Sequence, residues 1–280
     1  MTKTNILLTG ALGYLGSNYR ASLHSTSLTT YATDLKSAAS VTHLDICKEI
    51  SVRVPPPFGV INLAGIGRRG LGDKDPNLTH EVNVGGTSNL LEFCRRERAE
   101  WVILIGTNDS TTGPYTASKE TARQIGKQFS TLGLKVGVLN LPYVYGGINE
   151  PVDRLIPRFL KQAILNRTIR VDAPHLRFDF LHVEDVVEGL QKFQSFLSMT
   201  DRAYTEVDLC TGVGTTITNL AEVVIEACAS SSELIVASRE SPYSPLPTPT
   251  EFDRLIGRFE KICLASWLRL YGDTERAAMQ

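Results

Sequence analysis

The sequence predicts an α/β fold, a doubly wound parallel sheet with a smaller α/β lobe attached towards its C-terminal end. Short, continuous apolar runs alternate with amphipathic stretches through the first half of the chain. Continuous apolar strands separated by helices are typical of a parallel sheet that is covered on both faces. The composition agrees, since 280 residues with 42% hydrophobic and 21% charged residues are ordinary for a globular protein.

The alternation defines each expected element of the first half. Apolar runs predict strands, and apolar residues at helical spacing between these runs predict helices. The expected strands are 6–9, 30–34, 60–64, 101–105 and 136–141, and the expected helices are 17–23, 81–96 and 115–132.

After Gly146 the alternation of apolar runs and amphipathic stretches changes. Helices are expected at 155–165, 183–196 and 217–229, and extended segments at 168–171 and 207–209. Residues 238–250 contain four prolines and predict a loop or an extended connection, because proline lacks the amide that helices and sheets require. An apolar cluster at 267–270 indicates a C-terminal helix that docks on the rest of the protein.

Charge and cysteine content exclude several functions. Lys and Arg number 29 against 30 Asp and Glu, so there is no overall electrostatic basis for binding nucleic acid or a membrane surface. The five cysteines are scattered without a CxxC pair, which indicates neither a disulfide framework nor a metal site. No apolar stretch approaches the roughly 18 residues of a membrane span or forms a signal-peptide core. We therefore expect a cytoplasmic protein.

A glycine-rich segment follows the first expected strand. Gly10, Gly13 and Gly16 have the spacing G-x-x-G-x-x-G and lead into a helix. In this context they allow a tight turn, a close approach of the backbone to a pyrophosphate, and close packing of helix on sheet. The pattern predicts a dinucleotide-binding domain of the Rossmann type.

An acidic residue ends the second expected strand. Asp34 has the position at which a carboxylate accepts hydrogen bonds from the adenosine ribose and repels a 2′-phosphate, which favours NAD over NADP. Lys36 would offset part of that repulsion, so NADP stays open as an alternative cofactor. Asp34 has a second interpretation, as an aspartate that caps a turn.

The domain boundaries follow from these patterns. Residues 1–146, with returning segments near 175–212, are expected to form the NAD-binding domain. Residues 147–174 and 213–280 are expected to form the smaller substrate-binding lobe.

Three residues in the middle of the chain predict hydride-transfer chemistry. Tyr115 and Lys119 lie at i and i+4 on one expected helix face. A nearby ammonium favours the phenolate and lowers the tyrosine pKa towards the range of a general acid/base. Thr107, at the end of the preceding strand, has a hydroxyl that can donate to a substrate oxygen.

With these motifs the sequence resembles the extended short-chain dehydrogenase/reductase family, in its branch of nucleotide-sugar epimerases and dehydratases. The resemblance covers residues 5 to about 230 and fades through the proline-rich segment. Besides the glycine loop and the Tyr–Lys pair, segments 43–46, 62–65, 75–76, 83–91, 142–146, 156–159 and 178–186 match family motifs in order.

The resemblance implies residue roles. Tyr115 would be the acid/base, Lys119 its partner and a ribose ligand, and Thr107 the hydroxyl that polarises the substrate. The implied cofactor-binding residues are Gly10, Gly13, Tyr14, Leu15, Gly16, Asp34, Leu35, Asp45, Ile46, Leu63, Ala64, Gly65, Asn83, Tyr115, Lys119, Pro142, Tyr143 and Val144. The implied substrate-binding residues are Thr107, Asp109, Tyr143 and Arg177, and no metal is expected. Asn83 has an equal interpretation as a helix N-cap.

Several departures from the family pattern restrict the reactions and substrates that we expect. Dehydratases have Thr-Asp-Glu where this chain has Thr107-Asn108-Asp109, so 4,6-dehydration is not expected. Asp109 then acts as a lone base or caps a turn. Only seven residues separate Thr107 from Tyr115, which predicts a smaller or more open substrate pocket. Phe178 replaces an arginine that grips the nucleotide diphosphate, and Arg177 either takes over that contact or is a surface residue.

Three more positions have alternative interpretations. Asn140 replaces another frequent arginine of the family. Arg68 and Arg69 meet an anionic substrate or belong to a solvated loop, the latter being favoured. His182, which resembles a metal or catalytic residue in isolation, is interpreted as a structural histidine at a strand end.

The leading hypothesis is an NAD-dependent oxidoreductase or epimerase that acts on a carbinol of a sugar-like, nucleotide-linked small molecule. A dehydrogenase or NAD(P)H-dependent ketoreductase uses the same residues and stays an alternative, as does a non-catalytic dinucleotide-binding regulator. The helices at 81–96 and 115–132 resemble those that form an intersubunit four-helix bundle, so a homodimer is expected.

Overall fold

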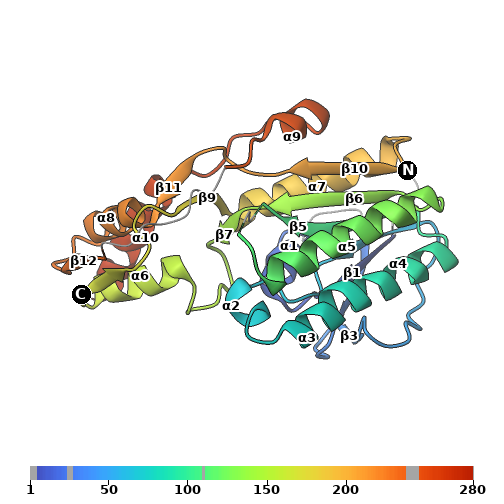
Figure 1. Cartoon of the computed structure of the whole chain (residues 1–280), viewed down its shortest axis with the longest axis horizontal. Coiled ribbons are helices and arrows are strands. Elements are labelled where there is room, and N and C mark those ends of the chain that lie inside the picture. The colour runs from blue at the N-terminus through green and yellow to red at the C-terminus, as the bar shows by residue number, and fades with distance from the viewer. Residues whose placement is uncertain (1–4, 24–27, 109–110, 238–245, 280) are drawn as a thin grey trace.

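The computed structural model describes residues 5–23, 28–108, 111–237 and 246–279. The chain forms a large α/β domain that contains the N-terminus and a smaller lobe that contains the C-terminus (Figure 1). The proline-rich segment 238–250 lies mostly outside the described residues.

A seven-stranded parallel sheet forms the centre of the large domain, in the order β10-β6-β5-β4-β1-β2-β3. The strands are β1 (Asn5–Thr9), β2 (Thr29–Asp34), β3 (Thr42–His43), β4 (Phe58–Asn62), β5 (Trp101–Thr107), β6 (Val136–Leu141) and β10 (Tyr204–Asp208). β1 pairs with both β2 and β4, so the direction in which successive strands are added reverses there. Ligands of open α/β sheets bind at such a switch point, beyond the carboxyl ends of the strands.

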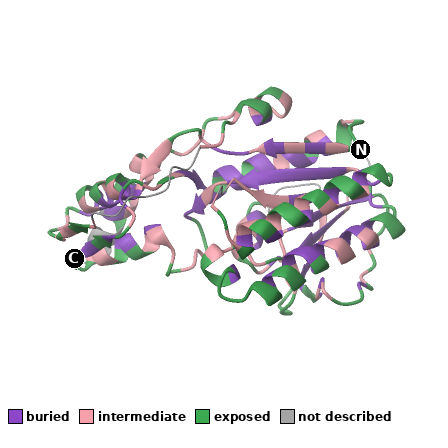
Figure 2. Ribbon diagram, in the orientation of Figure 1, coloured by how far each residue is buried: buried purple, intermediate pink, exposed green. Residues whose placement is uncertain are grey.

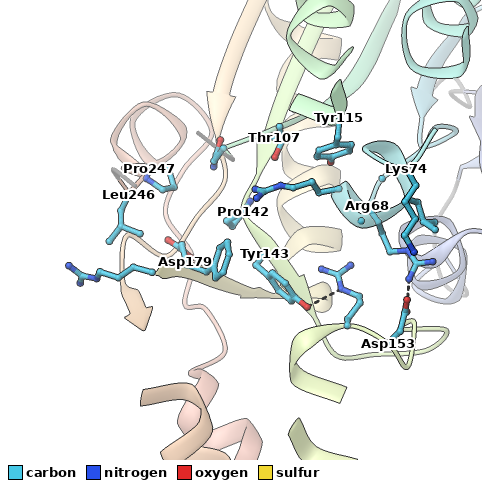
Figure 3. Close-up of a pocket in the computed structure, with 18 residues that line it drawn as sticks. Arg68, Lys74, Thr107, Tyr115, Pro142, Tyr143, Asp153, Asp179, Leu246 and Pro247 are labelled. Atoms are coloured by element: carbon cyan, nitrogen blue, oxygen red, sulfur yellow. Dashed lines mark hydrogen bonds and ion pairs between the residues drawn. The ribbon is translucent and has the colours of Figure 1, made fainter. Parts of the chain in front are cut away.

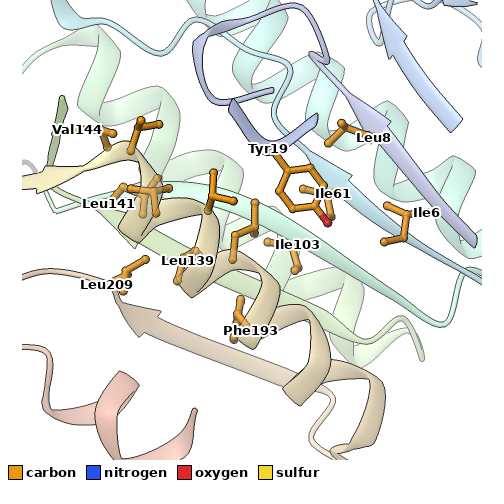
Figure 4. Packing of buried hydrophobic residues seen from close by; sticks show 14 of the residues in the cluster. Ile6, Leu8, Tyr19, Ile61, Ile103, Leu139, Leu141, Val144, Phe193 and Leu209 are labelled. Carbon is orange, nitrogen blue, oxygen red and sulfur yellow. The ribbon is translucent and has the colours of Figure 1, made fainter. Parts of the chain in front are cut away.

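Helices cover both faces of this sheet (Figure 1). α1 (Tyr14–Ala21) and α7 (Val183–Met199) lie on one face, and α4 (Thr87–Arg96) and α5 (Pro114–Thr131) lie on the other. Because successive side chains of a strand point to opposite faces, Ile6 and Leu8 belong to the core on the α1/α7 side, whereas Leu7 belongs to the core on the α4/α5 side. Figure 4 shows Ile6 and Leu8 near Ile61 on the first side. The prediction of a doubly wound parallel sheet is confirmed.

Burial explains why the central strands are apolar throughout. All of β4 and β6 is buried, with helices on both faces, and Figure 2 shows this band of buried strands through the large domain. β10, at one edge, alternates between buried and half-buried residues instead.

The segment before α4 differs from the single helix expected at 81–96. The helical region begins earlier, with α3 (Pro76–His80), and continues through a π-helical stretch, η1 (Glu81–Gly86), into α4. Asp75 caps α3, since its carboxylate accepts a hydrogen bond from Leu78 N at 3.0 Å. The interpretation of Asn83 as an N-cap is therefore wrong. π-helical turns often occur at functional sites, and Asn83 lies within this one.

The smaller lobe has its own core. It contains α6 (Leu155–Ile164), β8 (Ile169–Val171), α8 (Ile217–Ala227), β12 (Leu234–Val236) and α10 (Leu264–Met279). A three-stranded sheet of β7 (Tyr143–Tyr145), β9 (Arg177–His182) and β11 (Gly214–Thr216) joins the lobe to the large domain. Leu268 is fully buried in the lobe core, which confirms that the apolar cluster at 267–270 belongs to a docked C-terminal helix.

One part of the expected lobe packs elsewhere. The sequence prediction assigned all of 213–280 to the lobe, but α9 (Thr250–Leu255) lies against β10. Its Phe252 is fully buried in the core of the large domain, next to the α7 side of the sheet. The chain therefore returns to the large domain once more after residue 237, because this apolar side chain is buried there.

Candidate active site

The glycine loop after β1 lies against the end of β4. Gly10 has φ +67°, and a Cβ on Gly10 would lie 2.5 Å from Ala64 N. A Cβ on Gly16 would lie 2.1 Å from Gly10 O, so any side chain there would separate the loop from α1. Gly13 is the residue before α1 and provides no side-chain cap. The first amides of α1, from Tyr14 and Leu15 onwards, therefore have the geometry that binds a phosphate group.

Asp34 lies at the carboxyl end of β2 and faces this loop. Its Oδ2 accepts a hydrogen bond from Leu12 N at 2.9 Å, and its Oδ1 accepts one from Lys36 N at 3.2 Å. The carboxylate thus caps the turn, which is one of the two interpretations from the sequence, and it is fixed beside the glycine loop. These residues fit a dinucleotide with an adenosine ribose at Asp34.

Asn83 connects the end of β4 to α5. Its Oδ1 accepts from Ile66 N at 2.8 Å, and its Nδ2 donates to Ile66 O at 3.1 Å and to Ser118 Oγ at 2.9 Å. A Cβ on Gly65 would lie 2.9 Å from Asn83 Oδ1. Asn83 therefore fixes the backbone that follows β4, where the sequence placed Leu63, Ala64 and Gly65 beside the cofactor.

Tyr115 and Lys119 lie in the first turns of α5, next to the end of β5. Gly113 precedes the helix and Pro114 is its first residue, while Asp73 Oδ1 accepts from Tyr115 N at 3.0 Å and fixes this end. The Tyr115 hydroxyl makes a side-chain hydrogen bond with Thr107, the last residue of β5. Lys119 Nζ donates to Ile105 O at 3.2 Å, also in β5. The structure thus brings the three predicted catalytic residues together.

The electrostatics of this group differ from the sequence expectation. Burial raises the pKa of Tyr115, and the groups that oppose this rise are Thr107, through its hydrogen bond, and the charges of Arg154 and Arg69. Burial also lowers the pKa of Lys119 to about 8. The expectation that Lys119 lowers the Tyr115 pKa is not met, because burial outweighs the attraction of the nearby cations, and those cations are Arg154 and Arg69.

A cavity of about 470 Å³ opens beside Tyr115 and Thr107, between the large domain and the lobe. Its wall comes from seven separate parts of the chain, and Figure 3 shows residues from these parts around the cavity. The lining residues include Arg68, Arg69, Lys74, Thr107, Asn108, Tyr115, Pro142, Tyr143, Asp153, Arg154, Arg177, Phe178, Asp179, Leu246 and Pro247. This volume is sufficient for a small organic substrate.

Arg154 is a site residue that the sequence analysis missed. Its guanidinium carbon lies 4.4 Å from the centre of the Tyr143 ring and 5.5 Å from that of Tyr14. Its Nε lies 3.8 Å from Glu150 Oε1, and the Tyr14 hydroxyl donates to Gly146 O at 2.7 Å. Arg154 therefore connects the start of α1, the β7 turn and the lobe. Its position two residues before the matched segment 156–159 was the signal in the sequence.

Asp179 and Leu246 were also missed as cavity residues. Asp179 is buried, and it accepts hydrogen bonds from Thr211 N, Thr211 Oγ1 and Gly212 N at 3.1, 2.8 and 2.6 Å. Leu246 lies within the proline-rich segment 238–250 and beside Gly214. Neither residue has a local pattern that indicates its place at the cavity.

Other predicted residues occupy varied positions. Pro142 and Tyr143 line the cavity, and Val144 is buried behind them. Arg177 lines the cavity and donates to Gly214 O at 3.1 Å. Asp109 lies outside the described residues.

The expected adenine contacts form a separate group. Leu35 is exposed, Ile46 is buried against Gly86, and Asp45 Oδ1 accepts from Cys47 N at 2.9 Å. None of these residues lines the cavity beside Tyr115.

The structure also places the remaining singled-out positions. Arg68 and Arg69 line the cavity and are half-buried, and Arg68 pairs with Asp153. His182 is buried at the end of β9, and its Nδ1 accepts a hydrogen bond from Glu184 N at 3.3 Å, which makes it a structural cap of α7. Asn140 is buried and donates to Glu206 Oε1 and Asp208 Oδ1, both at 3.1 Å.

Among the described residues, no helix has the length and apolar character needed to cross a membrane. Within the same residues, no group of three or more His, Cys, Asp or Glu side chains could hold a metal ion.

The fold and the site define a dinucleotide-binding α/β protein with a substrate cavity at the end of its sheet. A sequence model of the NAD dependent epimerase/dehydratase family matches residues 6–195, more than half of the chain. The protein belongs to this NAD-dependent family, and its cofactor is NAD.

Individual relatives are more distant. Short-chain dehydrogenase/reductase family 42E member 1 of Macaca fascicularis is 28% identical over 116 residues, 38% of this chain and 30% of that protein. The chain thus matches less than a third of that relative's length. A Thermotoga maritima UDP-glucose 4-epimerase solved with UDP-glucose has a TM-score of 0.83 at 19% identity, covering 99% of this chain and all of that one. A Thermus thermophilus UDP-glucose 4-epimerase solved with NAD has a TM-score of 0.80 at 21% identity, covering 98% and 99%. The structural matches establish the shared fold.

Proposed function

We propose that this protein is an NAD-dependent oxidoreductase or epimerase that acts on a carbinol of a sugar-like, nucleotide-linked substrate, with Tyr115 as the acid/base. The observation that carries the proposal is the arrangement of Tyr115. Its hydroxyl is hydrogen-bonded to Thr107 and faces a cavity of about 470 Å³ at the carboxyl edge of a dinucleotide-binding sheet. The family and the solved nucleotide-sugar epimerases with the same fold support the substrate class.

The cofactor would lie across the ends of β1 and β4. The glycine loop and the first amides of α1 would hold the pyrophosphate, and Asp34 would accept hydrogen bonds from the adenosine ribose. When bound, NAD supplies the carbon that accepts and returns a hydride. Asp34 favours NAD because its charge repels a 2′-phosphate, and Lys36 does not remove that charge.

The chain's own residues move the proton. The Tyr115 oxygen would accept the proton of the substrate hydroxyl, and Thr107 would donate a hydrogen bond to the oxygen that remains. Arg154 and Arg69 would stabilise the phenolate, since their charges oppose the rise of the Tyr115 pKa. Lys119 would hold the ribose next to this group, because its amine lies at the end of β5 near Gly65.

The same residues serve three outcomes. If the ketone stays bound and the hydride returns to its other face, the product is an epimer. If the ketone leaves, the enzyme is a dehydrogenase, and the reverse reaction makes it a ketoreductase. A non-catalytic regulator would need neither Tyr115 nor Lys119, and both are in place in the structure.

The first test identifies the nucleotide that copurifies with the protein. Freshly purified protein is denatured, and released nucleotides are separated by chromatography. Near-stoichiometric NAD or NADH is the result expected for an epimerase, which retains its cofactor through the cycle. Protein that is empty but binds NADH reversibly supports the dehydrogenase or reductase, and protein that binds no dinucleotide contradicts the proposal.

We also propose a homodimer through α4 and α5, which lie side by side on one face of the sheet. Light scattering is expected to give twice the 30.8 kDa chain mass. A mass of one chain at micromolar concentration would contradict this assembly.

A further inference from the structure

Glu150 is a buried carboxylate whose two oxygens have different surroundings. Its side chain is only 9% exposed. Oε2 accepts a hydrogen bond from Gly146 N at 2.7 Å, whereas Oε1 has no hydrogen bond among the described residues and lies 3.8 Å from Arg154 Nε. Burial raises the pKa of Glu150, and the Gly146 amide and the Arg154 charge oppose this rise. A carboxylate that is buried to this extent needs a partner of opposite charge, and Arg154 has that role.

The loop that ends at Glu150 is fixed on α1. The Tyr14 hydroxyl donates to Gly146 O at 2.7 Å. Asn18 Nδ2 donates to Ile148 O at 2.8 Å, and Asn18 Oδ1 accepts from Ile148 N at 3.0 Å. Because α1 begins at Tyr14 and its first amides have the geometry that binds a phosphate, Glu150 has a fixed place relative to the cofactor half of the site.

Arg154 lies over two aromatic rings. Its guanidinium carbon is 4.4 Å from the centre of the Tyr143 ring and 5.5 Å from that of Tyr14. Its Nε also donates to the Tyr143 hydroxyl at 3.4 Å, and that hydroxyl accepts from Leu155 N at 2.8 Å. Tyr14 begins α1, Tyr143 lines the cavity, and Leu155 begins α6. Arg154 is largely buried among these groups, with 16% of its side chain exposed.

Arg154 also acts on Tyr115. Both side chains line the cavity, and the positive charge of Arg154 opposes the rise of the Tyr115 pKa. Glu150 does not line the cavity. Its carboxylate would therefore influence Tyr115 through the position of Arg154.

Other groups face Tyr115 from the elements that pack around it. Thr107 ends β5 and is hydrogen-bonded to the Tyr115 hydroxyl, and Lys119 lies on α5 itself. α2 (Arg69–Gly72) begins with an arginine whose charge also opposes the rise of the pKa of this tyrosine. Asp73, directly after α2, accepts a hydrogen bond from Tyr115 N. The experiment below keeps all of these groups unchanged.

We propose that Glu150 is a positioning residue, whose buried carboxylate is fixed on α1 and holds the Arg154 guanidinium in the cavity wall, where its charge stabilises the Tyr115 phenolate. This inference rests on the proposed function, in which Tyr115 is the acid/base. Without the carboxylate, Arg154 would be a largely buried charge that has lost its anion, and turning outwards into water would lower its free energy. Glu150 thereby sets the place of a cavity charge relative to the cofactor helix.

The ionisation of Tyr115 can be measured directly, without a substrate. The protein is labelled with 3-fluorotyrosine, excess NAD is added, and a fluorine NMR titration follows each tyrosine as the pH is raised. The Tyr115 signal is the one that the Tyr115→Phe variant lacks. Fluorine withdraws electrons and makes the phenol more acidic, which brings the titration towards the pH range in which the protein stays folded.

Glu150→Gln keeps an oxygen that can accept from Gly146 N and removes the charge. We expect it to raise the titration midpoint of Tyr115 by roughly one pH unit, the lower end of the effect of a nearby opposite charge. Arg154→Gln should raise the midpoint by at least as much. Glu150→Asp keeps a carboxylate and should cause a smaller rise than Glu150→Gln. Bound NAD should be unchanged in Glu150→Gln, because the hydrogen bonds between the loop and α1 remain.

A double variant shows whether Glu150 acts through Arg154. In the Arg154→Gln background, Glu150→Gln has no guanidinium left to displace. The double variant should therefore have the same midpoint as Arg154→Gln alone. Two shifts that add would show that Glu150 acts on Tyr115 independently of Arg154, and would overturn the inference.

Glu188→Gln is the matched control. Glu188 pairs with Lys192 at 3.6 Å, also at i and i+4, but this pair lies on α7 and 50% of the Glu188 side chain is exposed. The Tyr115 midpoint should keep its wild-type value in this variant. A shift as large as that of Glu150→Gln would show that the effect does not depend on the pair beside the cavity, and would overturn the inference.

The remaining outcomes separate this inference from the proposed function. An unchanged midpoint in Glu150→Gln overturns the inference, and so does a lower one, which would mean that the carboxylate only offsets the Arg154 charge. The expected midpoints in a protein that binds no dinucleotide would support the positioning role and contradict the proposed function. Conversion of a nucleotide sugar with NAD, together with a wild-type midpoint in Glu150→Gln, would support the function and overturn the inference.

Discussion

The cofactor half and the substrate half of the site are built in different ways. The cofactor half consists of backbone from short, contiguous motifs, in which Gly10 and Gly16 allow contacts that a Cβ would prevent. The substrate half consists of side chains from seven separate parts of the chain, and four of these side chains are arginines that line the same cavity. The backbone geometry of the glycine loop depends on residues close together in the sequence. The electrostatic environment of the cavity depends on residues that come together only after folding.

This difference predicts two kinds of mutational response. In the cofactor half, a change should act through steric exclusion and should affect binding and folding together. In the substrate half, a change should act through charge or a single proton and should leave the fold intact. The four predictions below test this contrast, from the largest expected effect to the smallest.

Removal of one oxygen at Tyr115 should have the largest effect. Tyr115→Phe removes the group that accepts the proton, and general acid–base catalysis contributes about 10²–10⁴-fold to rate. We expect kcat to fall by roughly a thousandfold, while bound NAD, measured after denaturation, is unchanged. A variant with full activity would show that Tyr115 is not the acid/base. Loss of NAD would show that the two halves of the site are not separable.

A methyl group at Gly16 should affect the cofactor half. A Cβ on Gly16 would lie 2.1 Å from Gly10 O and 2.8 Å from Ala11 Cα, so the backbone must move. We expect Gly16→Ala to lower the free energy of unfolding by about 1–3 kcal/mol, typical of overpacking, and to weaken NAD binding. Urea denaturation and NAD titration measure both.

Gly85→Ala provides the matched control. Gly85 lies in η1, and nothing lies within 4 Å of its Cβ position. This variant should retain wild-type stability and NAD binding. Equal behaviour of Gly16→Ala and Gly85→Ala would contradict the role assigned to the glycine loop.

Removal of the charge at Asp34 should change cofactor preference. Asp34→Asn keeps an oxygen that can accept from Leu12 N but removes the repulsion of a 2′-phosphate. The ratio of kcat/KM for NAD to that for NADP should fall by roughly tenfold, as expected when a charge-assisted hydrogen bond becomes a neutral one. Asp172→Asn, an exposed change in the lobe, should leave the ratio unchanged. An unchanged ratio in Asp34→Asn would show that Asp34 only caps its turn.

Lys119 should show a conflict between function and stability. Its pKa is lowered from 10.5 to about 8 by burial, so the charged form destabilises the fold below pH 8. This penalty should disappear as the pH rises from 8 to 10.5, because the unfolded chain binds more protons than the folded protein in that window. We expect Lys119→Met to raise the free energy of unfolding of the cofactor-free protein by about 1–2 kcal/mol at pH 7, after loss of the hydrogen bond to Ile105 O.

The same variant should lose turnover. Denaturant unfolding at pH 7 and at pH 10.5 measures the stability difference from wild type, which should shrink at the higher pH. A stability difference that does not depend on pH, or a variant that is less stable than wild type at pH 7, would show that the buried charge of Lys119 does not destabilise the fold.

Much of the large domain was predictable because its signals are local. The apolar runs at 6–9 and 136–141 indicated strands β1 and β6, and Thr107, Tyr115 and Lys119 were recognised from their spacing together with the glycine loop that precedes them. The short strands β7, β9 and β11 were not predicted as a sheet. They have few residues each, and their pairing depends on partners far away in sequence.

The helical region around Asn83 shows a limit of a different kind. The residues that follow Glu81 have the periodicity of a helix, but periodicity does not show that the helix begins at Pro76 or that its middle is π-helical. The role of Asn83 depends on this geometry, because its amide contacts Ile66 and Ser118 from other elements. Whether Asn83 caps a helix or connects the end of β4 to α5 was therefore decided by the folded structure.

The sequence by itself determined the fold class, the glycine loop and the three residues expected at the reacting centre, because each depends on residues close together in the chain. The tertiary structure alone decided the place of Arg154 and Asp179 at the cavity, the return of Phe252 to the large domain, and the direction of the Tyr115 pKa. Burial and the charge around a group are sums over all parts of the molecule that pack against it. A local sequence pattern therefore does not determine the burial of a group or the charge around it.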